Sequence, residues 1–348
     1  MRFWSTAATL LVSGALLLLL WWLFWGPQAL PEIERVEMPF MGKELVIEVL
    51  PQEGGVARAR AALIAAMRQA ESVEALMSDN NQNSEIARLN AAAAGEQVIL
   101  SADTLTLLMV AKRYYADCAH SFDITLAPII DQWIEAQARQ ELPSKDVLNA
   151  IRQDTDWQSF IFDNDSVRKK NDLSRLNLSA IAKGYAIDRV VHALKTAGLQ
   201  TAKVQIDGNM RVFGTTPKHT PQQAYIVNPF DNSKTLVRYI VQNAGVGTSG
   251  NRARYMEIKQ RKYSHIIDPR TLMPSRQRAS VTVVASSALA ADVWATALAV
   301  LGVTGLKELP DDVAAFMILG DEDSMQLVCN ENFAKLLITT PSELQIYP

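Results

Sequence analysis

One acidic residue, Asp292, lies in a long apolar stretch, 287–301, that has the composition of a buried helix. Thr296 follows four positions later, and positions four apart lie on the same face of an α-helix. A carboxylate buried without a partner is unfavourable, so we expect a positive group to meet Asp292. A hard cation such as Mg²⁺ binds oxygen ligands, often together with phosphates, and fits both side chains. A helix N-cap network or an arginine partner fits the same two residues.

Three further stretches concentrate residue types that can do chemistry, at 122–128, 177–188 and 263–274. Taken singly, each also has a structural interpretation. His265 could be a hydrogen-bonded structural histidine, Lys183 a solvated lysine, and Asp123 a helix N-cap, because its carboxylate can accept from nearby backbone N–H groups. The sequence contains no zinc-ligand spacing, P-loop, GxGxxG or nucleophile elbow.

The elements that must position these residues alternate irregularly between strand and helix. Period-two and β-branched patterns predict strands, and apolar positions at helical spacing, with Ser84 and Ser101 as N-caps, predict helices. The strands are expected at 44–50, 202–206, 280–285, 314–319 and 325–328, and the main helices at 57–77, 101–115, 176–199 and 287–301. Because no regular βαβ repeat is present, we expect an α+β fold with mixed sheets and packed helices.

The N-terminus carries an uncharged segment, 3–25, rich in Leu, Ala and Trp and long enough to span a bilayer. We expect residues 1–30 to be an uncleaved membrane anchor, with a cleaved signal peptide as the alternative, 26–38 to be a linker, and 31–348 to be the functional domain. Arg2 on the short side and three tryptophans on the other orient the chain out of the cytoplasm. We therefore expect a single anchor in a bacterial inner membrane and a domain facing the periplasm. Cys118 and Cys329 could pair there or stay as free thiols.

Charge excludes one class of partner. The net charge is −3, so no global field attracts nucleic acid. A local basic run, Arg252, Arg254, Lys259, Arg261 and Lys262, is most simply a solvated strand and loop; contact with a phosphate or an acidic partner is the alternative.

Taken together and in order, the polar stretches resemble the ApbE family of flavin transferases. The most specific matches are Ser-His-x-x-Asp-Pro-Arg-Thr at 264–271 and Ala-Asp-x-x-Ala-Thr-Ala at 291–297. Segments at 122–125, 182–188 and 248–250 match as well, and the resemblance covers essentially the whole chain beyond residue 38.

The resemblance implies that the chain binds FAD and Mg²⁺ and transfers the FMN half of FAD to a Thr or Ser hydroxyl of a partner protein, releasing AMP. Anchored members of the family modify flavin-carrying subunits of membrane redox complexes, so we expect an acceptor protein of that kind. Two alternatives remain: an FAD pyrophosphatase that releases free FMN and AMP, and a non-catalytic FAD-binding assembly module.

The resemblance also assigns roles to individual residues. Asp292 and Thr296, with backbone carbonyls of Ala180 and Ala295, are expected to hold the metal. His265 is the group best suited to take a proton from the acceptor hydroxyl near neutral pH. The residues expected to contact FAD are Met41, Asn80, Ser121, Phe122, Asp123, Asn177, Lys183 and Ile267.

The chain departs from the family pattern at several positions. Lys43 stands in place of a usual Thr, Asp79-Asn80 in place of Thr-Tyr, Asn177 in place of Asp, and Asp207 in place of Gly; Leu272 also replaces a Gly. None of these changes removes Asp292, Thr296 or His265, so they bear on the FAD pocket more than on the class of reaction.

Overall fold

Alternating strands build the centre of the fold. The structure, a computed structural model, describes residues 33–51, 55–79, 81–216, 220–231, 233–250, 255–275 and 279–348. Within these residues, nine strands form one sheet in the order β1-β2-β6-β7-β10-β15-β16-β17-β19. Neighbouring strands are antiparallel except β17 and β19, so the sheet is mixed as predicted. The strands are β1 (Glu34–Phe40), β2 (Lys43–Val49), β6 (Ala202–Ile206), β7 (Asn209–Phe213), β10 (Gly245–Gly250), β15 (Ala279–Ala285), β16 (Ala314–Leu319), β17 (Gln326–Asn330) and β19 (Leu344–Tyr347).

Each face of this sheet has its own core, as the period of two requires. On β15, Val281 and Val283 belong to the core beneath the long helices, whereas Val284 faces the opposite core. That second core is closed by a three-stranded sheet and a short helix. These are β8 (Gln222–Val227), β9 (Thr235–Val241), β18 (Leu337–Thr339) and α9 (Glu331–Ala334).

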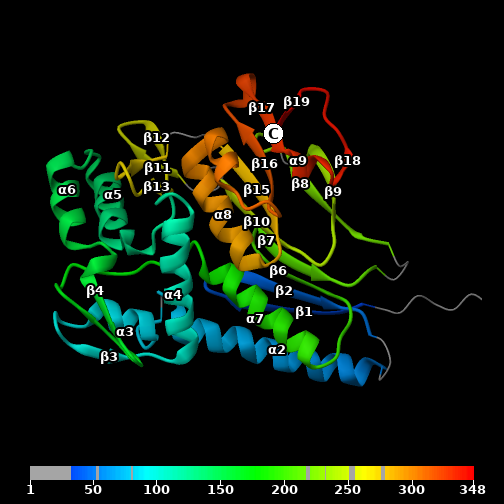
Figure 1. Ribbon diagram of the computed structural model, residues 1–348, viewed down its shortest axis with the longest axis horizontal. Coiled ribbons are helices and arrows are strands. Elements are labelled where there is room, and N and C mark those ends of the chain that lie inside the picture. The colour runs from blue at the N-terminus through cyan, green and yellow to red at the C-terminus, as the bar shows by residue number, and fades with distance from the viewer. Residues whose placement is uncertain are drawn as a thin grey trace, which may run out of the picture. The chain divides into compact units, whose positions relative to one another are not determined.

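Three helices cover the first face: α2 (Gly55–Met77), α7 (Ala182–Thr196) and α8 (Ala288–Leu301). Figure 1 shows α2 and α7 side by side, with α8 next to α7. Helix α7 ends at Thr196, and Gly198 follows with a φ of +82°, the left-handed conformation that glycine adopts readily. Leu199 N–H then bonds to Leu194 C=O, which completes a Schellman motif.

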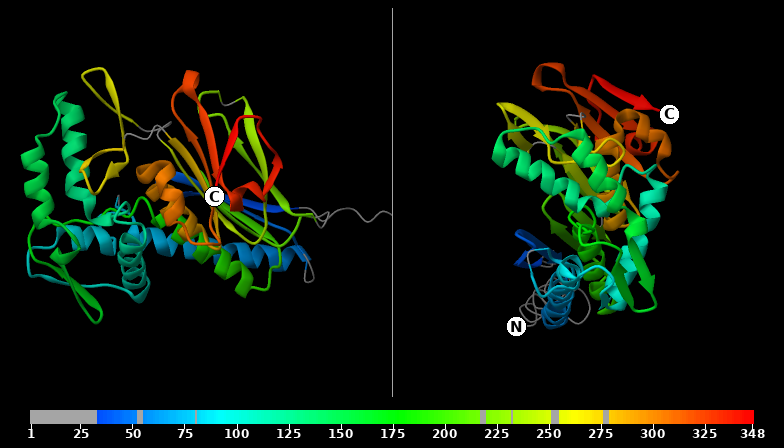
Figure 2. Two further views of the ribbon diagram at one scale, coloured as in Figure 1. Left: turned by 45° about the horizontal axis from the view of Figure 1, so that its top comes forward. Right: turned by 90° about the vertical axis from the view of Figure 1, so that its left-hand side faces the viewer.

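The remaining elements form a helical side with a small sheet. The helices are α3 (Glu85–Ala91), α4 (Ala102–Asp117), α5 (Ala127–Arg139) and α6 (Lys145–Asp154), and the strands β3 (Gln97–Ile99), β4 (Phe160–Asp163) and β5 (Ser166–Lys169). Two hairpins lie beside α5: β11 (Tyr255–Ile258) with β12 (Arg261–Ser264), and β13 (Ile267–Asp268) with β14 (Met273–Pro274). A separate core around Trp133 joins α5 and α6 to these hairpins. Figure 2 shows the β11–β12 hairpin in yellow from two further sides.

Most predicted elements are confirmed. The predicted N-caps Ser84 and Ser101 each accept a backbone N–H bond, and Ser144 caps α6 in the same way. The linker predicted for 26–38 is wrong at its C-terminal end, because residues 34–38 belong to β1 and pair in register with β2. Strand β1 lies at the edge of the sheet, which explains why Pro39 did not prevent a strand, since an edge strand tolerates proline.

Two predictions concern the membrane and the cysteines. The anchor predicted for 1–30 lies outside the described residues. Among those described, one helical stretch, Ala288–Glu308, is long and apolar enough to cross a bilayer, and 72% of it is buried inside the fold. Cys118 and Cys329 are both free and buried, in two different cores, so they do not pair.

Candidate active site

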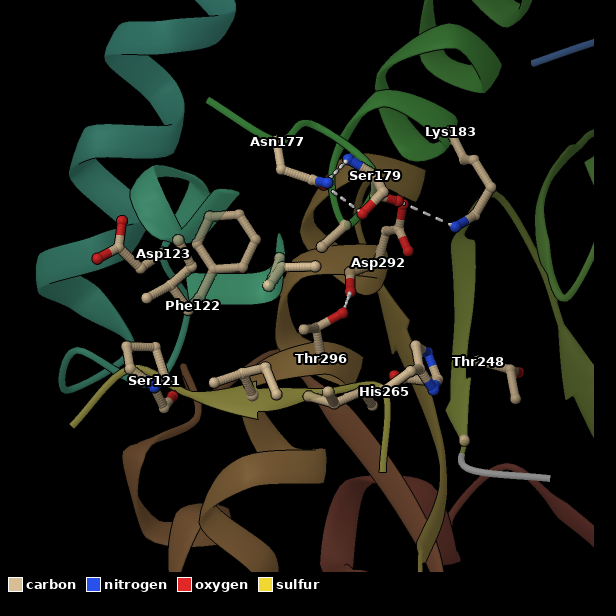
Figure 3. Close-up of a pocket in the computed structure, with 18 of the residues that line it drawn as sticks. Ser121, Phe122, Asp123, Asn177, Ser179, Lys183, Thr248, His265, Asp292 and Thr296 are labelled. Carbon is tan, nitrogen blue, oxygen red and sulfur yellow. Dashed lines mark hydrogen bonds between the residues drawn. The ribbon is translucent and has the colours of Figure 1, made fainter. Parts of the chain in front are cut away.

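A cavity gathers most of the residues selected from the sequence. Figure 3 shows side chains from α7, α8, β10 and the segment before β13 around one space. Ten predicted residues line this cavity: Ser121, Phe122, Asp123, Asn177, Ala180, Lys183, His265, Ile267, Asp292 and Thr296. Met41 lines a second cavity, which shares Lys183 and Ser179 with the first. Asn80 lies outside the described residues.

Asp292 is a nearly buried carboxylate in the cavity wall, with 4% of its surface exposed. Its Oδ2 atom accepts a hydrogen bond of 3.1 Å from the backbone N–H of Gly184. Asn209 lies beside it, and the Asn209 Nδ2 atom is buried without a well-formed hydrogen bond to any described atom. Burial raises the pKa of Asp292, while Lys183, Asn209 and the Gly184 N–H each favour the charged form. The carboxylate is therefore stabilised only in part by the protein.

The hydroxyl of Thr296 is the second side-chain oxygen of the expected metal site. Its hydroxyl donates to the carbonyl of Asp292 at 3.1 Å, which leaves the hydroxyl lone pairs directed away from the helix backbone. In the stretch 290–300, every residue except Thr296 is buried. The side-chain pair expected from four-residue spacing therefore faces the cavity together.

Helices α7 and α8 cap one another. The carboxylate of Asp188 on α7 accepts from the backbone N–H groups of Ala288 and Leu289, both at 3.0 Å, in the first turn of α8. Arg211 pairs with the same carboxylate and also donates to Ser286 C=O. In return, Asp292 accepts the Gly184 N–H from the first turn of α7. These N–H groups have no partner inside their own helices, so the exchange fixes how the two helices meet.

Two glycines allow the close approach that this exchange needs. A Cβ atom on Gly184 would lie 2.6 Å from Ala288 O and Leu289 Cα. A Cβ atom on Gly247 of β10 would lie 2.4 Å from the Ala291 carbonyl and 2.6 Å from Asp292 N. Only glycine fits at these contacts, which seat the start of α8 against both α7 and the sheet.

His265 reaches the cavity from a tightly bonded turn. Ser264 Oγ accepts the Ile266 N–H at 2.9 Å, and Ser275 N–H donates to Ile266 C=O at 2.7 Å. Two residues further on, Asp268 accepts from the backbone N–H and the guanidinium of Arg270. The Ser-His-x-x-Asp-Pro-Arg-Thr segment is thus a structural clamp that holds the histidine at the cavity wall.

The turn that precedes α7 forms another part of the cavity wall. Asn177 Oδ1 accepts from the backbone N–H of Ser179 at 3.0 Å and from its hydroxyl at 2.5 Å. Lys183 Nζ then donates to Ser179 C=O at 3.2 Å, so the ammonium group is held over this turn. Ala180, whose carbonyl was expected to bind metal, lies in the same turn and lines the cavity.

Two residues expected to contact FAD have polar groups that are already engaged. The Asp123 side chain is fully enclosed, and its carboxylate binds Arg152 at 2.6 Å and accepts from the Thr125 backbone N–H and hydroxyl. The N-cap interpretation of Asp123 is therefore confirmed. Ser121 donates its hydroxyl to Cys118 C=O at 2.6 Å. These residues shape the cavity wall around the buried Phe122 ring.

Ala295, next to Thr296 in α8, was expected to bind metal through its backbone carbonyl. It is fully buried and lines neither cavity. Adjacent helix positions are turned by about 100° from each other, so the Ala295 side chain faces away from the cavity that Thr296 faces, and the role of its backbone carbonyl stays a prediction.

An ion pair that the sequence did not predict lies between the two cavities. Lys43 Nζ and Asp207 Oδ2 are 3.2 Å apart, and both residues line both cavities. Asp207 has a φ of +54°, at the position where the family usually has Gly. Lys43 and Asp207 both replace the residue that is usual in the family. These two replacements together were the signal in the sequence that could have predicted the ion pair.

The donor set fits a hard divalent cation. A nearly buried carboxylate with a raised pKa and a threonine hydroxyl, both facing one cavity beside a backbone turn, are oxygen ligands of the kind that Mg²⁺ takes. Within the described residues, no group of three or more His, Cys, Asp or Glu side chains could hold a metal. Any cation here would therefore draw its other ligands from backbone carbonyls, water and substrate.

Comparisons with known proteins agree on one family. A model of the ApbE family matches residues 41–329. A Vibrio cholerae protein named FAD:protein FMN transferase is 29% identical over 309 residues, which cover 86% of this chain and 91% of that protein. An Escherichia coli protein of the same name is 27% identical over 281 residues, covering 78% of this chain and 80% of that one.

Solved structures give the same result. The apo form of the Pseudomonas stutzeri flavinyl transferase ApbE superposes with a TM-score of 0.78 at 28% identity, covering 89% of this chain and 98% of that chain. The Vibrio cholerae flavin transferase ApbE gives a TM-score of 0.75 at 26% identity, covering 88% and 100%. With an α+β fold, the Asp292–Thr296 pair and the His265 clamp all in place, this chain belongs to the ApbE family.

Proposed function

We propose that this chain is an FAD:protein FMN transferase that uses Mg²⁺, joins the FMN half of FAD to a Thr or Ser hydroxyl of a partner protein, and releases AMP. The relatives that carry this name, and membership of their family, support the proposal. The observation that carries it is the meeting of Asp292, Thr296, Lys183 and His265 around one cavity, from three separate parts of the chain.

Asp292 Oδ1 and Oδ2, Thr296 Oγ1 and the Ala180 carbonyl are the groups that would hold Mg²⁺. When bound, the cation neutralises negative charge on phosphate oxygens. Lys183 adds a second positive charge on the same side of the cavity, beside the Ser179 carbonyl that fixes it. The buried side chains of Phe122 and Ile267 add apolar surface to the cavity wall, and electrostatic effects are stronger beside such low-dielectric surface.

The proposed transfer is a displacement at phosphorus. The acceptor hydroxyl oxygen forms a bond to the phosphorus of the FMN phosphate, and the bond from that phosphorus to the oxygen bridging to the AMP half breaks. The bridging oxygen leaves with AMP. His265 takes the hydroxyl proton as the bond forms, a role that suits imidazole near neutral pH. Such transfer depends mainly on positioning and on charge neutralisation, which is what the described residues provide.

The test uses purified full-length chain in detergent, FAD, Mg²⁺ and candidate acceptor proteins. We expect a covalent flavin on an acceptor, found by mass spectrometry, together with AMP. Release of free FMN and AMP with no labelled acceptor would favour the pyrophosphatase alternative, and FAD binding with no AMP would favour the assembly module. His265→Ala is expected to lower the transfer rate more than FAD affinity; an equal loss of both would make His265 a binding residue.

We also propose that the enzyme is anchored in a bacterial inner membrane by its N-terminal segment and acts in the periplasm on a subunit of a membrane redox complex. Support comes from the uncharged segment 3–25 with Arg2 before it and Trp21, Trp22 and Trp25 at its end. Digestion of the domain by protease added to intact spheroplasts, whose inner membrane is closed, is the expected result. Digestion only after the membrane is opened would place the domain in the cytoplasm.

A further inference from the structure

The basic run singled out from the sequence forms part of a concentrated positive segment. Residues 251–278 contain eight Lys or Arg and two Asp or Glu, in a chain whose net charge is −3. One of those basic residues, Arg270, is neutralised by Asp268. Lys259, Arg261 and Lys262 are exposed and make no ion pair with any described residue. The segment lies between Gly250 and the end of the His265 turn, and both of these line the cavity.

The hairpin β11–β12 presents these charges rigidly. Its inner face packs through buried Met256 and Ile258 into the core around Trp133. Gln140 clamps the tip, because its side chain accepts from Lys259 N–H at 2.8 Å and donates to Glu257 C=O at 2.9 Å. The charged tip is therefore held in place by α5.

The conformation of the tip is unusual for its residues. Lys259 and Gln260 have φ values of +49° and +63°, as a two-residue type I′ turn requires. Asn and Gly are the residues that favour this turn, so a lysine here has a conformational cost. The outer face adds Tyr255, which is 44% exposed, with Lys262 Nζ 4.3 Å from its ring centroid. The same face carries the exposed Glu257 opposite Lys262, so residues 255–264 have three Lys or Arg and one Glu. An aromatic ring beside this positive excess on one rigid face suits recognition of a polypeptide.

The hairpin is continuous with the active site, and this position indicates which polypeptide it would bind. Strand β12 runs directly into the turn that carries His265, so Lys262 is three residues and Lys259 six residues from the histidine. At about 3.3 Å per residue, these separations are at most roughly 10 and 20 Å. If an acceptor chain approaches His265 along β12, the residues within a few positions of its modified hydroxyl lie beside the hairpin.

We propose that the β11–β12 hairpin is the docking surface for the acceptor protein, and that it recognises acidic side chains about three to six residues from the modified hydroxyl. This inference rests on the proposed function, because it needs an acceptor hydroxyl at His265.

The test is peptide binding to the full-length chain, measured by fluorescence anisotropy. The probe is a labelled twelve-residue peptide with one Thr and with Asp at three positions three to six residues away; its partner peptide has Asn at those positions. We expect the Asp peptide to bind wild type about tenfold more tightly than the Asn peptide, and less tightly as salt is raised. The K259E/K262E variant, and more mildly K259Q/K262Q, should lose that preference. K335E, which changes an exposed lysine just after α9, should keep it.

Equal affinity of the wild type for both peptides, or an unchanged preference in K259E/K262E, would overturn the proposal. Vesicles containing phosphatidylglycerol are tested in parallel. If the hairpin variant loses vesicle binding but keeps its peptide preference, the surface binds lipid and the proposal fails. AMP release from FAD is measured on the same samples, so failure of the transferase function is seen separately from failure of docking.

Discussion

The Asp292 carboxylate accepts a hydrogen bond of 3.1 Å from the backbone N–H of Gly184, 108 residues earlier in the chain. That contact makes the proposed metal ligand part of a helix-capping exchange between α7 and α8. The two interpretations that the sequence left open for Asp292, a cation ligand and a capping network, are therefore compatible. The capping bond uses one carboxylate oxygen and leaves the carboxylate with a raised pKa.

Gly184→Ala should separate the two helices. The new Cβ would lie 2.6 Å from backbone atoms of Ala288 and Leu289, and backbone cannot move aside as a flexible side chain can. We expect a loss of about 1–3 kcal/mol in the free energy of unfolding. Urea denaturation measures it, and a second scan with Mg²⁺ should show weaker stabilisation by the metal than in wild type. An unchanged midpoint would mean that the close approach is not needed.

Asp292→Asn should change how stability depends on pH. Burial raises the pKa of Asp292 in the folded state, so the folded protein binds this proton more tightly than the unfolded chain does. The carboxyl therefore becomes increasingly unfavourable to folding as pH rises from its unfolded pKa of about 4 to the raised folded value. Without metal, the variant should gain stability relative to wild type over that range.

The same variant should no longer be stabilised by Mg²⁺, because an amide is a poor substitute for the carboxylate ligand. Thermal melts of both proteins at several pH values, with and without Mg²⁺, measure both effects. If wild type and variant melt in parallel at every pH and respond equally to Mg²⁺, neither the burial cost nor the metal role of Asp292 holds.

Asp188→Asn should destabilise the start of α8. It removes the charge that pairs with Arg211 and weakens the acceptor for two helix N–H groups. We expect a loss of about 2–4 kcal/mol, since one partner of a largely enclosed pair stays behind. Asp103→Asn is the matched control: its pair with Arg189 is more exposed, so its loss should stay below about 1 kcal/mol. If both variants lost similar amounts of stability, the Asp188–Arg211 pair would contribute no more than an exposed surface ion pair.

Lys43→Thr should affect FAD binding more than stability. Lys43 and Asp207 lie where the two cavities join, and their side chains are 32% and 49% exposed, so the pair adds at most about 1 kcal/mol to stability. We expect the KM for FAD to rise about three- to tenfold with kcat within about twofold, because an attractive charge is lost in both ground and transition states. Lys203→Thr, which removes a comparable pair with Glu48 away from these cavities, is the control. Equal KM values for both variants would exclude a role for Lys43.

Local patterns predicted much of the fold and the site. Serine caps, period-two strands and the helical spacing of Asp292 and Thr296 are short-range features, so the sequence shows them directly. The sequence did not show that Asp188 caps a helix 100 residues later, or that Lys43 pairs with Asp207, because those contacts depend on how α7, α8 and the sheet pack. Ala295 was chosen for its backbone carbonyl by resemblance to the family, and only its burial can be read from the fold. Residues 34–38 looked like a linker because their strand character appears only once β2 pairs with them.

The most direct test of the account is intact-protein mass spectrometry of an acceptor after incubation with FAD and Mg²⁺, using wild type and Asp292→Ala. The account predicts an FMN adduct on the acceptor with wild type, matching AMP release, and none with Asp292→Ala although that variant remains folded by circular dichroism. An Asp292→Ala enzyme that labels the acceptor at the wild-type rate in Mg²⁺ would contradict it.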